Sequence, residues 1–253
     1  MSKIVSIHSF RGGTGKSNST ANLAGIVASC GYRVGIIDTD IQSPGIHVLF
    51  GFDEKSMNYS LNDYLWGRCN IEKAAYDVSS TLSKTADVKG RIYLIPSSIK
   101  AKDITKVLRD GLDFNLLNQG FQEILDILHL DYLFIDTHPG LNEETLLSIA
   151  ISDILVLILR PDRQDFQGTA VTVEVARKLE IPKMLLLINK ALPSLDFDAL
   201  QKQVEKAYNA PLAGILPLAE ELIQLASSDL FCLRHPKHPF SQVMYKVAKM
   251  IMQ

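Results

Sequence analysis

The stretch SFRGGTGKS, residues 9–17, decides how this 253-residue chain is expected to fold. The apolar alternation of residues 4–7 before it predicts a strand. Residues 18–30 after it place their apolar side chains on one helical face, and Gly31 supplies a C-terminal stop. A glycine-rich turn with Gly-Lys-Ser between a strand and a helix is the setting of a phosphate-binding P-loop.

The chemistry of this loop predicts a nucleotide-binding protein. Its glycines let backbone N–H groups approach phosphates closely, and a helix N-terminus attracts anions. Lys16 is expected to reach the β- and γ-phosphates, and the Ser17 hydroxyl to ligate Mg²⁺. The alternative, a turn that only links a strand to a helix, does not explain why Gly-Lys-Ser stands at this junction.

Composition favours an ordinary globular protein with one domain over residues 1–253. Hydrophobic residues make up 47% and the net charge is −2, so no overall basic field attracts nucleic acid, and a local basic patch stays open as an alternative. Cys30, Cys69 and Cys232 form no C-x-x-C pair, which argues against a zinc site or an iron–sulfur scaffold and suits a reducing cytoplasm. The N-terminus lacks a signal-peptide pattern, and apolar runs are too short to span a bilayer. We predict a cytoplasmic protein.

Acidic residues follow two further predicted strands. Asp38 and Asp40 come after the strand at 33–37, where open α/β sheets bind ligands. Taken alone, both could simply cap the following turn. Asp136 closes the apolar strand at 132–136, which is the Walker B arrangement of a carboxylate near Mg²⁺.

The remaining pattern alternates strands with helices. Further strands are predicted at 91–95, 153–159, 183–188 and 211–216, and helices at 46–50, 61–66, 99–109, 117–128, 167–179, 196–208 and 240–251, with a polar loop at 79–90. This order indicates an α/β fold, a mostly parallel sheet with helices on both faces. The last helix could be a membrane anchor, but packing on the core is the preferred interpretation, because only two lysines flank its apolar stripe.

The loop departs from the usual G-x-x-x-x-G-K-[ST] spacing, since Phe10 stands where the first glycine belongs. The pattern Arg11-Gly-Gly-Thr-Gly-Lys-Ser resembles the deviant Walker A box of the ParA/MinD ATPases, whose P-loop fold is of the SIMIBI type. That family carries a signature lysine in this box, which reaches the ATP of a partner subunit. Here Arg11 occupies the position and keeps the charge. Arg160 and Arg163, interpreted as loop charges, are the alternative suppliers of such a cation.

The resemblance also implies a set of site residues. Asp40 would orient the attacking water, and Asp38 would support the water shell of the metal, so that the catalytic set is Lys16, Asp40 and Arg11. His138 follows the Walker B acid where Pro or Ala is commoner in the family, and we interpret it as structural. The implied Mg²⁺ residues are Ser17, Asp38, Asp40 and Asp136. The implied ATP-binding residues are Gly12, Gly13, Thr14, Gly15, Lys16, Ser17, Asn18, Asn189, which would read the adenine edge, and Pro217, which would pack on the base.

By this resemblance the protein is an ATP-hydrolysing switch that forms a homodimer with ATP and positions a cargo through an activating partner protein. The cargo could be a plasmid, a chromosome, a division or flagellar site, or a microcompartment. The surface could be nucleoid DNA or, as the less favoured choice, a membrane. Three alternatives share the loop or the fold: a metal-insertion or reductase-type ATPase, a bacterial tyrosine kinase, and a small-molecule ligase such as dethiobiotin synthetase. The scattered cysteines argue against the first, and the last tyrosine, Tyr245, lies in a predicted helix and not in a tyrosine-rich tail.

Overall fold

The computed structural model describes residues 2–82 and 89–253. Over these residues an eight-stranded sheet runs in the order β3-β4-β2-β5-β1-β6-β7-β8. All neighbouring strands are parallel except β3, which pairs antiparallel with β4. The strands are β1 (Lys3–His8), β2 (Arg33–Asp38), β3 (Tyr76–Asp77), β4 (Arg91–Ile95), β5 (Tyr132–Asp136), β6 (Ile154–Leu159), β7 (Lys183–Ala191) and β8 (Leu212–Pro217).

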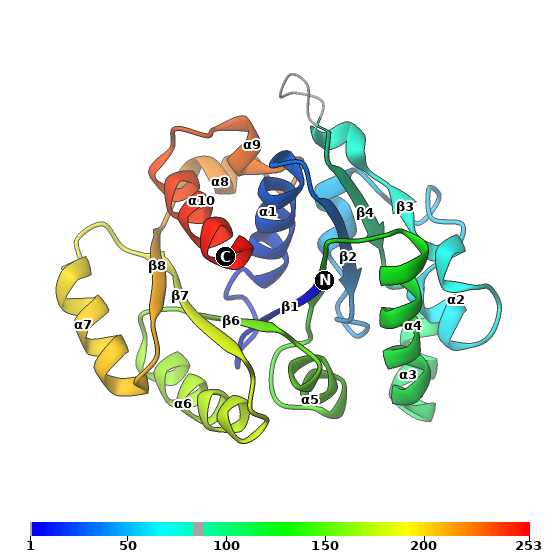
Figure 1. Cartoon of the computed structure of the whole chain (residues 1–253), viewed down its shortest axis with the longest axis horizontal. Coiled ribbons are helices and arrows are strands. Elements are labelled where there is room, and N and C mark those ends of the chain that lie inside the picture. Colours follow the sequence, from blue (N-terminus) through cyan, green and yellow to red (C-terminus); the bar gives the residue numbers. More distant parts are fainter. Residues whose placement is uncertain (1, 83–88) are drawn as a thin grey trace.

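Helices cover both faces of this sheet (Figure 1). The α-helices of the described residues are α1 (Lys16–Ser29), α2 (Leu61–Leu65), α3 (Ala101–Asp110), α4 (Phe114–Ile127), α5 (Glu143–Ala150), α6 (Arg163–Lys178), α7 (Phe197–Tyr208), α8 (Glu220–Gln224), α9 (Phe231–Arg234) and α10 (Pro239–Met252). Short 3₁₀ helices lie at Ile46–Phe50, Ile71–Ala74 and Ser79–Leu82. The predicted α/β fold with a mostly parallel sheet is therefore confirmed.

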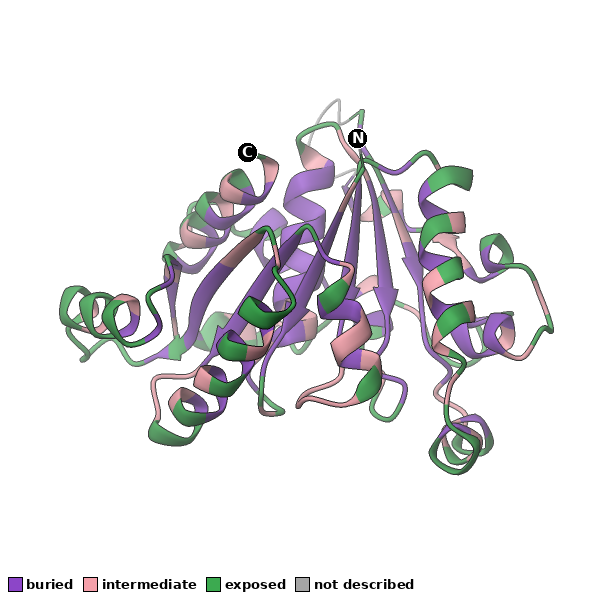
Figure 2. Cartoon of the chain, turned by 60° about the horizontal axis from the view of Figure 1, so that its bottom comes forward, coloured by how far each residue is buried: buried purple, intermediate pink, exposed green. Residues whose placement is uncertain are grey.

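Alternation along the strands divides the core between the two faces of the sheet, because successive side chains of a strand point to opposite sides. In β5, Tyr132 and Phe134 pack with α1 and α10, whereas Leu133 and Ile135 pack with α2 and α4. In β6, Leu155 and Leu157 face a third cluster formed with α5, α6 and α7. The sheet is accordingly buried along most of its length, and exposed residues gather on the outer faces of the helices (Figure 2).

The C-terminal helix α10 packs on the core, as the sequence favoured. Met244, Val247 and Ile251 are fully buried, in the same cluster as residues of α1 and β8. Its apolar stripe is thus already covered by the rest of the chain. In the described part of the chain, no helix has the length and apolar character needed to cross a membrane.

Several boundaries differ from the sequence-based expectation. Helix α6 begins at Arg163, not at 167, because the Asp162 side chain caps its first turn by accepting from the N–H groups of Gln164 and Asp165. Arg163 is therefore a helical residue and not a loop charge. Helix α5 was not predicted at all. Residues 83–88 of the expected polar loop lie outside the described residues.

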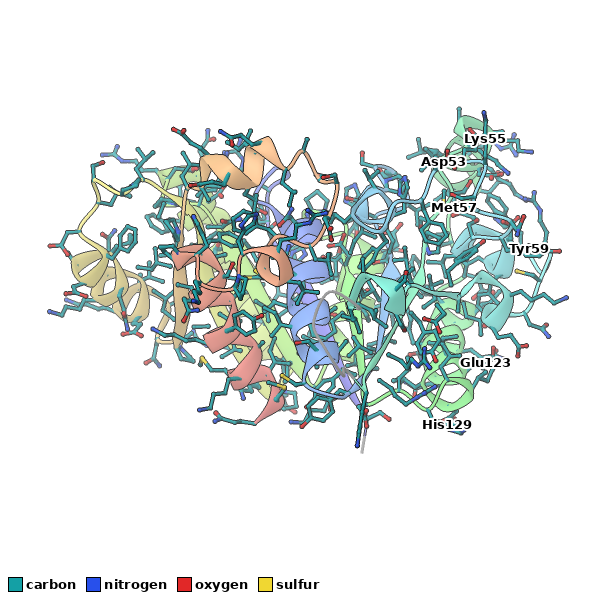
Figure 3. The ribbon with its side chains drawn as sticks, turned by 90° about the horizontal axis from the view of Figure 1, so that it is seen from above. Asp53, Lys55, Met57, Tyr59, Glu123 and His129 are labelled. Atoms are coloured by element: carbon teal, nitrogen blue, oxygen red, sulfur yellow. The ribbon has the colours of Figure 1, made fainter. Side chains whose placement is uncertain are left out.

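Residues 51–77 lie before β4 in the chain and end in β3, which extends the sheet beyond β4. Viewed from above, Asp53, Lys55 and Tyr59 project at one end of the molecule, at the opposite end from α7 (Figure 3). This end carries the antiparallel strand β3 and lies away from the glycine-rich loop. The glycine-rich loop instead follows β1, an inner strand of this sheet, at its carboxyl end.

Candidate nucleotide-binding site

Two glycines give the loop after β1 its curvature. Gly13 has φ 75° and Gly15 has φ 95°, the left-handed region that side chains disfavour. A Cβ at Gly15 would also lie 2.5 Å from Nδ2 of Asn189. The loop can therefore close over phosphates only with glycine at these positions, and Lys16 starts helix α1 directly afterwards.

The end of β7 holds this loop from the side. Nδ2 of Asn189 donates to the carbonyl of Thr14 at 2.8 Å, and Nζ of Lys190 donates to the carbonyl of Gly13 at 2.8 Å. Lys190 adopts φ 58°, and its N–H donates to Oδ1 of Asn189. Asn189 thus lies at the site as expected, with one amide hydrogen committed to the loop backbone. Lys190 is a further contact that the sequence analysis did not single out.

Strand register brings the acids to the loop. Ile7 pairs with Asp136, and Asp136 pairs with Asp38, so that three adjacent strands end at one place. Asp38 and Asp136 are buried, and Lys16 has only 7% of its surface exposed. The hydroxyl of Thr20 donates to Oδ1 of Asp136 at 3.0 Å. The structure therefore assembles the predicted P-loop and both predicted acid motifs in one buried site.

Burial dominates the electrostatics of these acids. It raises the pKa of Asp38 well above its usual value, and the neighbouring charges of Asp136 and Asp40 raise it further. Burial likewise raises the pKa of Asp136 to about 6, although hydrogen bonds from Ser17 and Thr20 and the charge of Lys16 oppose the rise. The pKa of Asp40 is raised by burial, against the lowering effect of His138 and Lys16. Crowded, desolvated carboxylates of this kind are stabilised by a nearby cation.

The site fits a Mg²⁺ ion that arrives with a nucleotide. Oδ1 of Asp38 accepts from the N–H of Asp40 at 3.0 Å, while Oδ2 is buried with no hydrogen-bond partner among the described residues. Oxygen ligands of this type suit Mg²⁺, which takes one or two carboxylates and completes its shell with water and phosphates. In the described part of the chain, no group of three His, Cys, Asp or Glu side chains could hold a metal ion. The carboxylates of Asp38 and Asp136 suit a metal bound jointly with phosphates, because Mg²⁺ takes only one or two carboxylates.

Asp40 is buried and lies beside His138. Its Oδ1 accepts from the N–H of Ser43 at 3.1 Å, and Nε2 of His138 is 3.8 Å away. Nδ1 of His138 contacts the carbonyl of Pro139 at 2.7 Å. His138 therefore contacts both the backbone of its own loop and the carboxylate of Asp40.

His8, the last residue of β1, was not singled out by the sequence analysis. Its Nδ1 is 2.8 Å from the hydroxyl of Thr137, and that hydroxyl donates to the carbonyl of Ile7. Burial, with the nearby charge of Lys16, lowers the pKa of His8 to about 3. The imidazole is therefore neutral at physiological pH, and it links the strand before the loop to the strand that carries Asp136.

Arg11 and Phe10 attach the front of the loop to helix α6. The Arg11 guanidinium donates to Oε1 of Gln164 and lies 3.8 Å from the buried carboxylate of Asp165. Phe10 packs on Gly168 so closely that a Cβ there would lie 2.0 Å from the ring. In this monomer Arg11 is thus engaged within its own chain, with 40% of its side chain exposed.

The two alternative arginines differ from Arg11. Arg160 forms a forked interaction with Asp165, with contacts of 3.1 and 3.2 Å, and lies 3.3 Å from Asp162. It therefore serves the start of α6 and is not available as a loop cation. Arg163 is exposed, in the first turn of that helix.

Three contacts escaped sequence reasoning for an identifiable reason. Thr20 contacts Asp136, Lys190 contacts Gly13, and Asp165 contacts Arg11. In each pair the two residues are far apart in the sequence. Lys190 adjoins the predicted Asn189, and that adjacency was the only available signal. Asp165 gave none, because the helix containing it was expected to start later.

Comparison with known proteins agrees with this geometry. A family model described as an AAA domain matches residues 2–185, which is more than half of the chain. The chain belongs to that family. It is a P-loop ATPase of the ParA/MinD type.

Similar proteins cover nearly the whole chain. An uncharacterized ATP-binding protein of Methanocaldococcus jannaschii is 27% identical over 250 residues, covering 98% of this chain and 87% of the relative. The septum site-determining protein MinD of Helicobacter pylori is 26% identical, covering 88% and 81%. An iron-sulfur cluster carrier protein of Clostridium perfringens is 29% identical, covering 87% and 78%.

Solved structures show the same fold. The cell division ATPase MinD of Pyrococcus furiosus superposes with a TM-score of 0.82 at 21% identity, covering 100% of this chain and 99% of that one. The septum site-determining protein MinD of Pyrococcus horikoshii, complexed with Mg-ADP, gives a TM-score of 0.81 at 21% identity, covering 99% and 96%.

Proposed function

We propose that this protein is an ATP-hydrolysing switch that dimerises with ATP and positions a cellular cargo through a partner protein. One observation carries the proposal: Lys16, Asp38 and Asp136 meet in a buried site beneath a glycine loop. Phosphoryl transfer asks a protein mainly for positioning and charge stabilisation, and this site offers both. The Mg-ADP complex of the Pyrococcus horikoshii relative supports the same nucleotide chemistry here.

The residues divide the work. The loop amides and Lys16 bind the phosphates, with Asn189 and Lys190 holding the loop backbone in its curved form. Ser17, Asp38, Asp40 and Asp136 would hold Mg²⁺, which would neutralise charge on the phosphates when bound. Asp40, beside His138, orients the attacking water. Asn189 near the end of β7 and Pro217 at the end of β8 are the residues that we assign to the base.

Arg11 gives the switch its dependence on a second copy. With ATP present, we infer that Arg11 leaves Gln164 and Asp165 and meets the phosphates of a partner subunit. Its side chain is 40% exposed, so the exchange does not require unfolding of the loop. Hydrolysis removes the phosphate charge that draws Arg11 to the partner subunit. Arg11 then returns to Gln164 and Asp165 of its own chain.

The site itself does not indicate the cargo or the surface, so both are inferred from other observations. The relatives named for septum positioning favour a positioning role over metal delivery. The iron-sulfur carrier relative keeps the alternative of metal-cluster transfer in view. That alternative lacks support from the cysteines, since Cys232 is buried and no three metal-ligating side chains gather among the described residues. Between DNA and a membrane surface we favour DNA, because α10 is packed on the core.

The test uses Asp40→Ala. This variant is expected to bind ATP, to release no phosphate, and to accumulate as a dimer in size-exclusion chromatography with light scattering. Wild type without nucleotide is expected to remain monomeric. If Asp40→Ala hydrolyses ATP at the wild-type rate, Asp40 is not the water-positioning group, and if no variant dimerises with ATP the switch proposal is wrong.

A further inference from the structure

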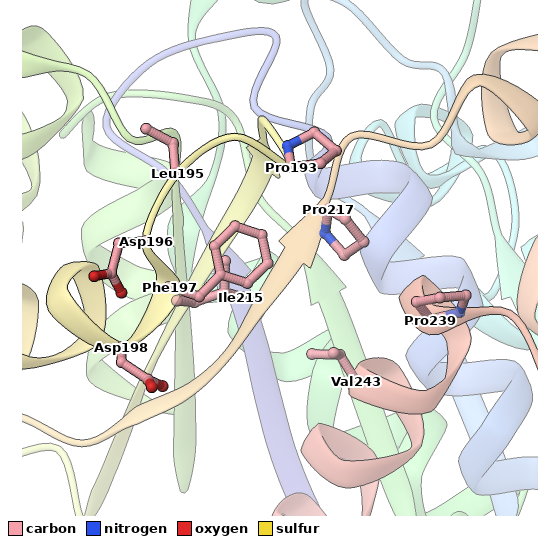
Figure 4. A pocket seen from close by; sticks show the side chains of 9 residues that line it. All are labelled: Pro193, Leu195, Asp196, Phe197, Asp198, Ile215, Pro217, Pro239 and Val243. Atoms are coloured by element: carbon pink, nitrogen blue, oxygen red, sulfur yellow. The ribbon is translucent and has the colours of Figure 1, made fainter.

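A hollow of about 440 Å³ lies at the outer edge of the sheet formed by the described residues, along its last strand β8. It runs across β8 from the start of α7 to the start of α10 (Figure 4). Leu195 and Phe197 line one side, Ile215 and Pro217 the strand, and Val243 the other side. Its volume falls in the range of ligand sites in proteins. Only Pro217 is shared with the residues expected at the nucleotide.

The loops around this hollow expose large apolar side chains. Leu192, Leu195 and Leu218 are 52%, 39% and 38% exposed. Their backbones are nevertheless held in place, since the N–H of Leu195 donates to the carbonyl of Leu192 and the N–H of Leu218 to that of Ala191. An ordered cluster of exposed apolar residues beside a hollow marks an interaction site more often than a chance exposure.

The charge at the hollow has one sign. Asp196 and Asp198 line it, and no lysine or arginine does. Asp196 caps α7 by accepting from the N–H of Ala199. Asp198 is exposed and forms no ion pair of 4.0 Å or less within the described chain. An apolar surface with an unpaired acid suits a ligand that carries an apolar group next to a cation.

We propose that this hollow binds a segment of another protein, with an apolar side chain between Phe197 and Val243 and a lysine or arginine against Asp198. A second copy fits less well, because a symmetric dimer through this face would place two surfaces of the same negative charge against each other. An anionic membrane surface is repelled by the same acids. Strand β8 is the last strand of the sheet formed by the described residues, so the segment meets an edge that no other strand covers.

The test measures binding of three fluorescein-labelled peptides by anisotropy. All three peptides have leucine at the same positions. The remaining positions are lysine in the first peptide, glutamine in the second and glutamate in the third. The lysine peptide is expected to bind most tightly. Asp198→Lys and Leu195→Glu are each expected to weaken it about tenfold. The matched controls are Glu174→Lys on α6 and Leu108→Glu on α3, which replace an exposed acid and an exposed leucine elsewhere. Both are expected to leave the affinity for the lysine peptide unchanged.

Methyl NMR locates the binding. Shifts of the Ile215 and Val243 methyl groups on adding the lysine peptide support the proposal. Equal affinity for the lysine and glutamate peptides, equal weakening by the control variants, or no binding of any peptide overturns it. Lys16→Ala is expected to bind the peptide like wild type, so that failure of the ATPase proposal stays distinguishable from failure of this one.

Discussion

Lys16 and Asp136 lie at the centre of the carboxyl edge with 7% and 1% of their surface exposed, whereas Arg11 at its rim has a side chain that is 40% exposed. The central residues are placed by strand register and by the start of α1, so the fold itself determines where they point. Arg11 is placed by Gln164 and Asp165, which are side chains of one helix. The centre is therefore prepared before a ligand arrives, while the rim can exchange one partner for another.

The largest expected effect comes from removing the central cation. Lys16→Ala should abolish ATP hydrolysis, because Lys16 is the residue proposed to contact the transferring phosphate and no other cation lies in the loop itself apart from Arg11. Phosphate release at saturating Mg-ATP measures the loss, and circular dichroism checks that the fold persists. The matched control is Lys202→Ala, an exposed lysine of α7. Unchanged turnover in Lys16→Ala would remove this residue from the mechanism.

The rim residue is tested next. Arg11→Ala should slow hydrolysis by about 10³-fold, the lower end of what an arginine supplied across an interface contributes in other phosphate-hydrolysing enzymes. It should also remain monomeric with ATP in light scattering, because the contact that joins two subunits is lost. Arg11→Lys should retain much of the activity, since the charge is kept. Arg163→Ala is the control, because Arg163 is an exposed arginine near the same edge.

If Arg11→Ala dimerises with ATP as well as wild type does, the trans role of Arg11 is wrong. If Arg163→Ala instead fails to dimerise with ATP, Arg163 in the first turn of α6 takes the trans role. Arg160 is a poor substitute in either case, because Asp165 and Asp162 already hold it.

The buried centre should also respond to pH in the absence of nucleotide. Folding raises the pKa of Asp136 from 3.8 to about 6. For a raised pKa the stabilising contribution is complete below the unfolded value and is lost as pH rises through the folded value. The interval between the two values corresponds to about 3 kcal/mol. Without Mg²⁺, Asp136→Asn should therefore be more stable than wild type at pH 7.5, with the advantage disappearing near pH 4.

Urea denaturation of both proteins across this pH range measures the difference in the free energy of unfolding. Glu174→Gln changes an exposed carboxylate in the same way and should give a difference that hardly varies with pH. A difference between Asp136→Asn and wild type that is equally flat would contradict the raised pKa.

The contrast between centre and rim also explains what the sequence could predict. Periodicity and the GKS junction located β1, the loop and α1, and an acid at the end of an apolar run located Asp136. These features depend on residues close in sequence. The seating of Arg11 depends on Asp165, more than 150 positions away, and on a helix start set by the Asp162 cap. Single-sequence patterns carry no information about such a distant pair.

The helix α5 was missed for a different reason. Its side chain pattern, EETLLSIA, is short, and its N-cap is Asn142, which accepts from the N–H of Thr145. The helix follows closely after a Pro-Gly pair and has only about two turns. Two turns contain too few apolar positions to reveal a helical hydrophobic period. The described structure supplies what was missing, since Ile149 packs against β6 and Leu147 lies next to the cluster around β5.

The smallest expected effect tests the link between the rim and the loop. Gly168→Ala adds a methyl group where a Cβ lies 2.0 Å from the Phe10 ring, so the ring must move. Alanine favours the helix by up to ~1 kcal/mol, and Phe10 is already 36% exposed, so the free energy of unfolding should change little. ATP-dependent dimerisation should weaken and turnover should fall by less than about 10²-fold, because the displaced ring shifts the neighbouring Arg11.

A double-mutant cycle with Phe10→Ala isolates this link. Once the ring is absent, Gly168→Ala has nothing to displace, so it should leave turnover of the Phe10→Ala protein unchanged. An equal loss in both backgrounds would mean that Gly168 acts through α6 alone. A loss of ATP affinity in the monomer would contradict the argument in another way, because Asn189 and Lys190 hold the rear of the loop independently of α6. The expected pattern, weaker dimerisation with intact monomer binding, requires the front and rear of one loop to be held by different elements.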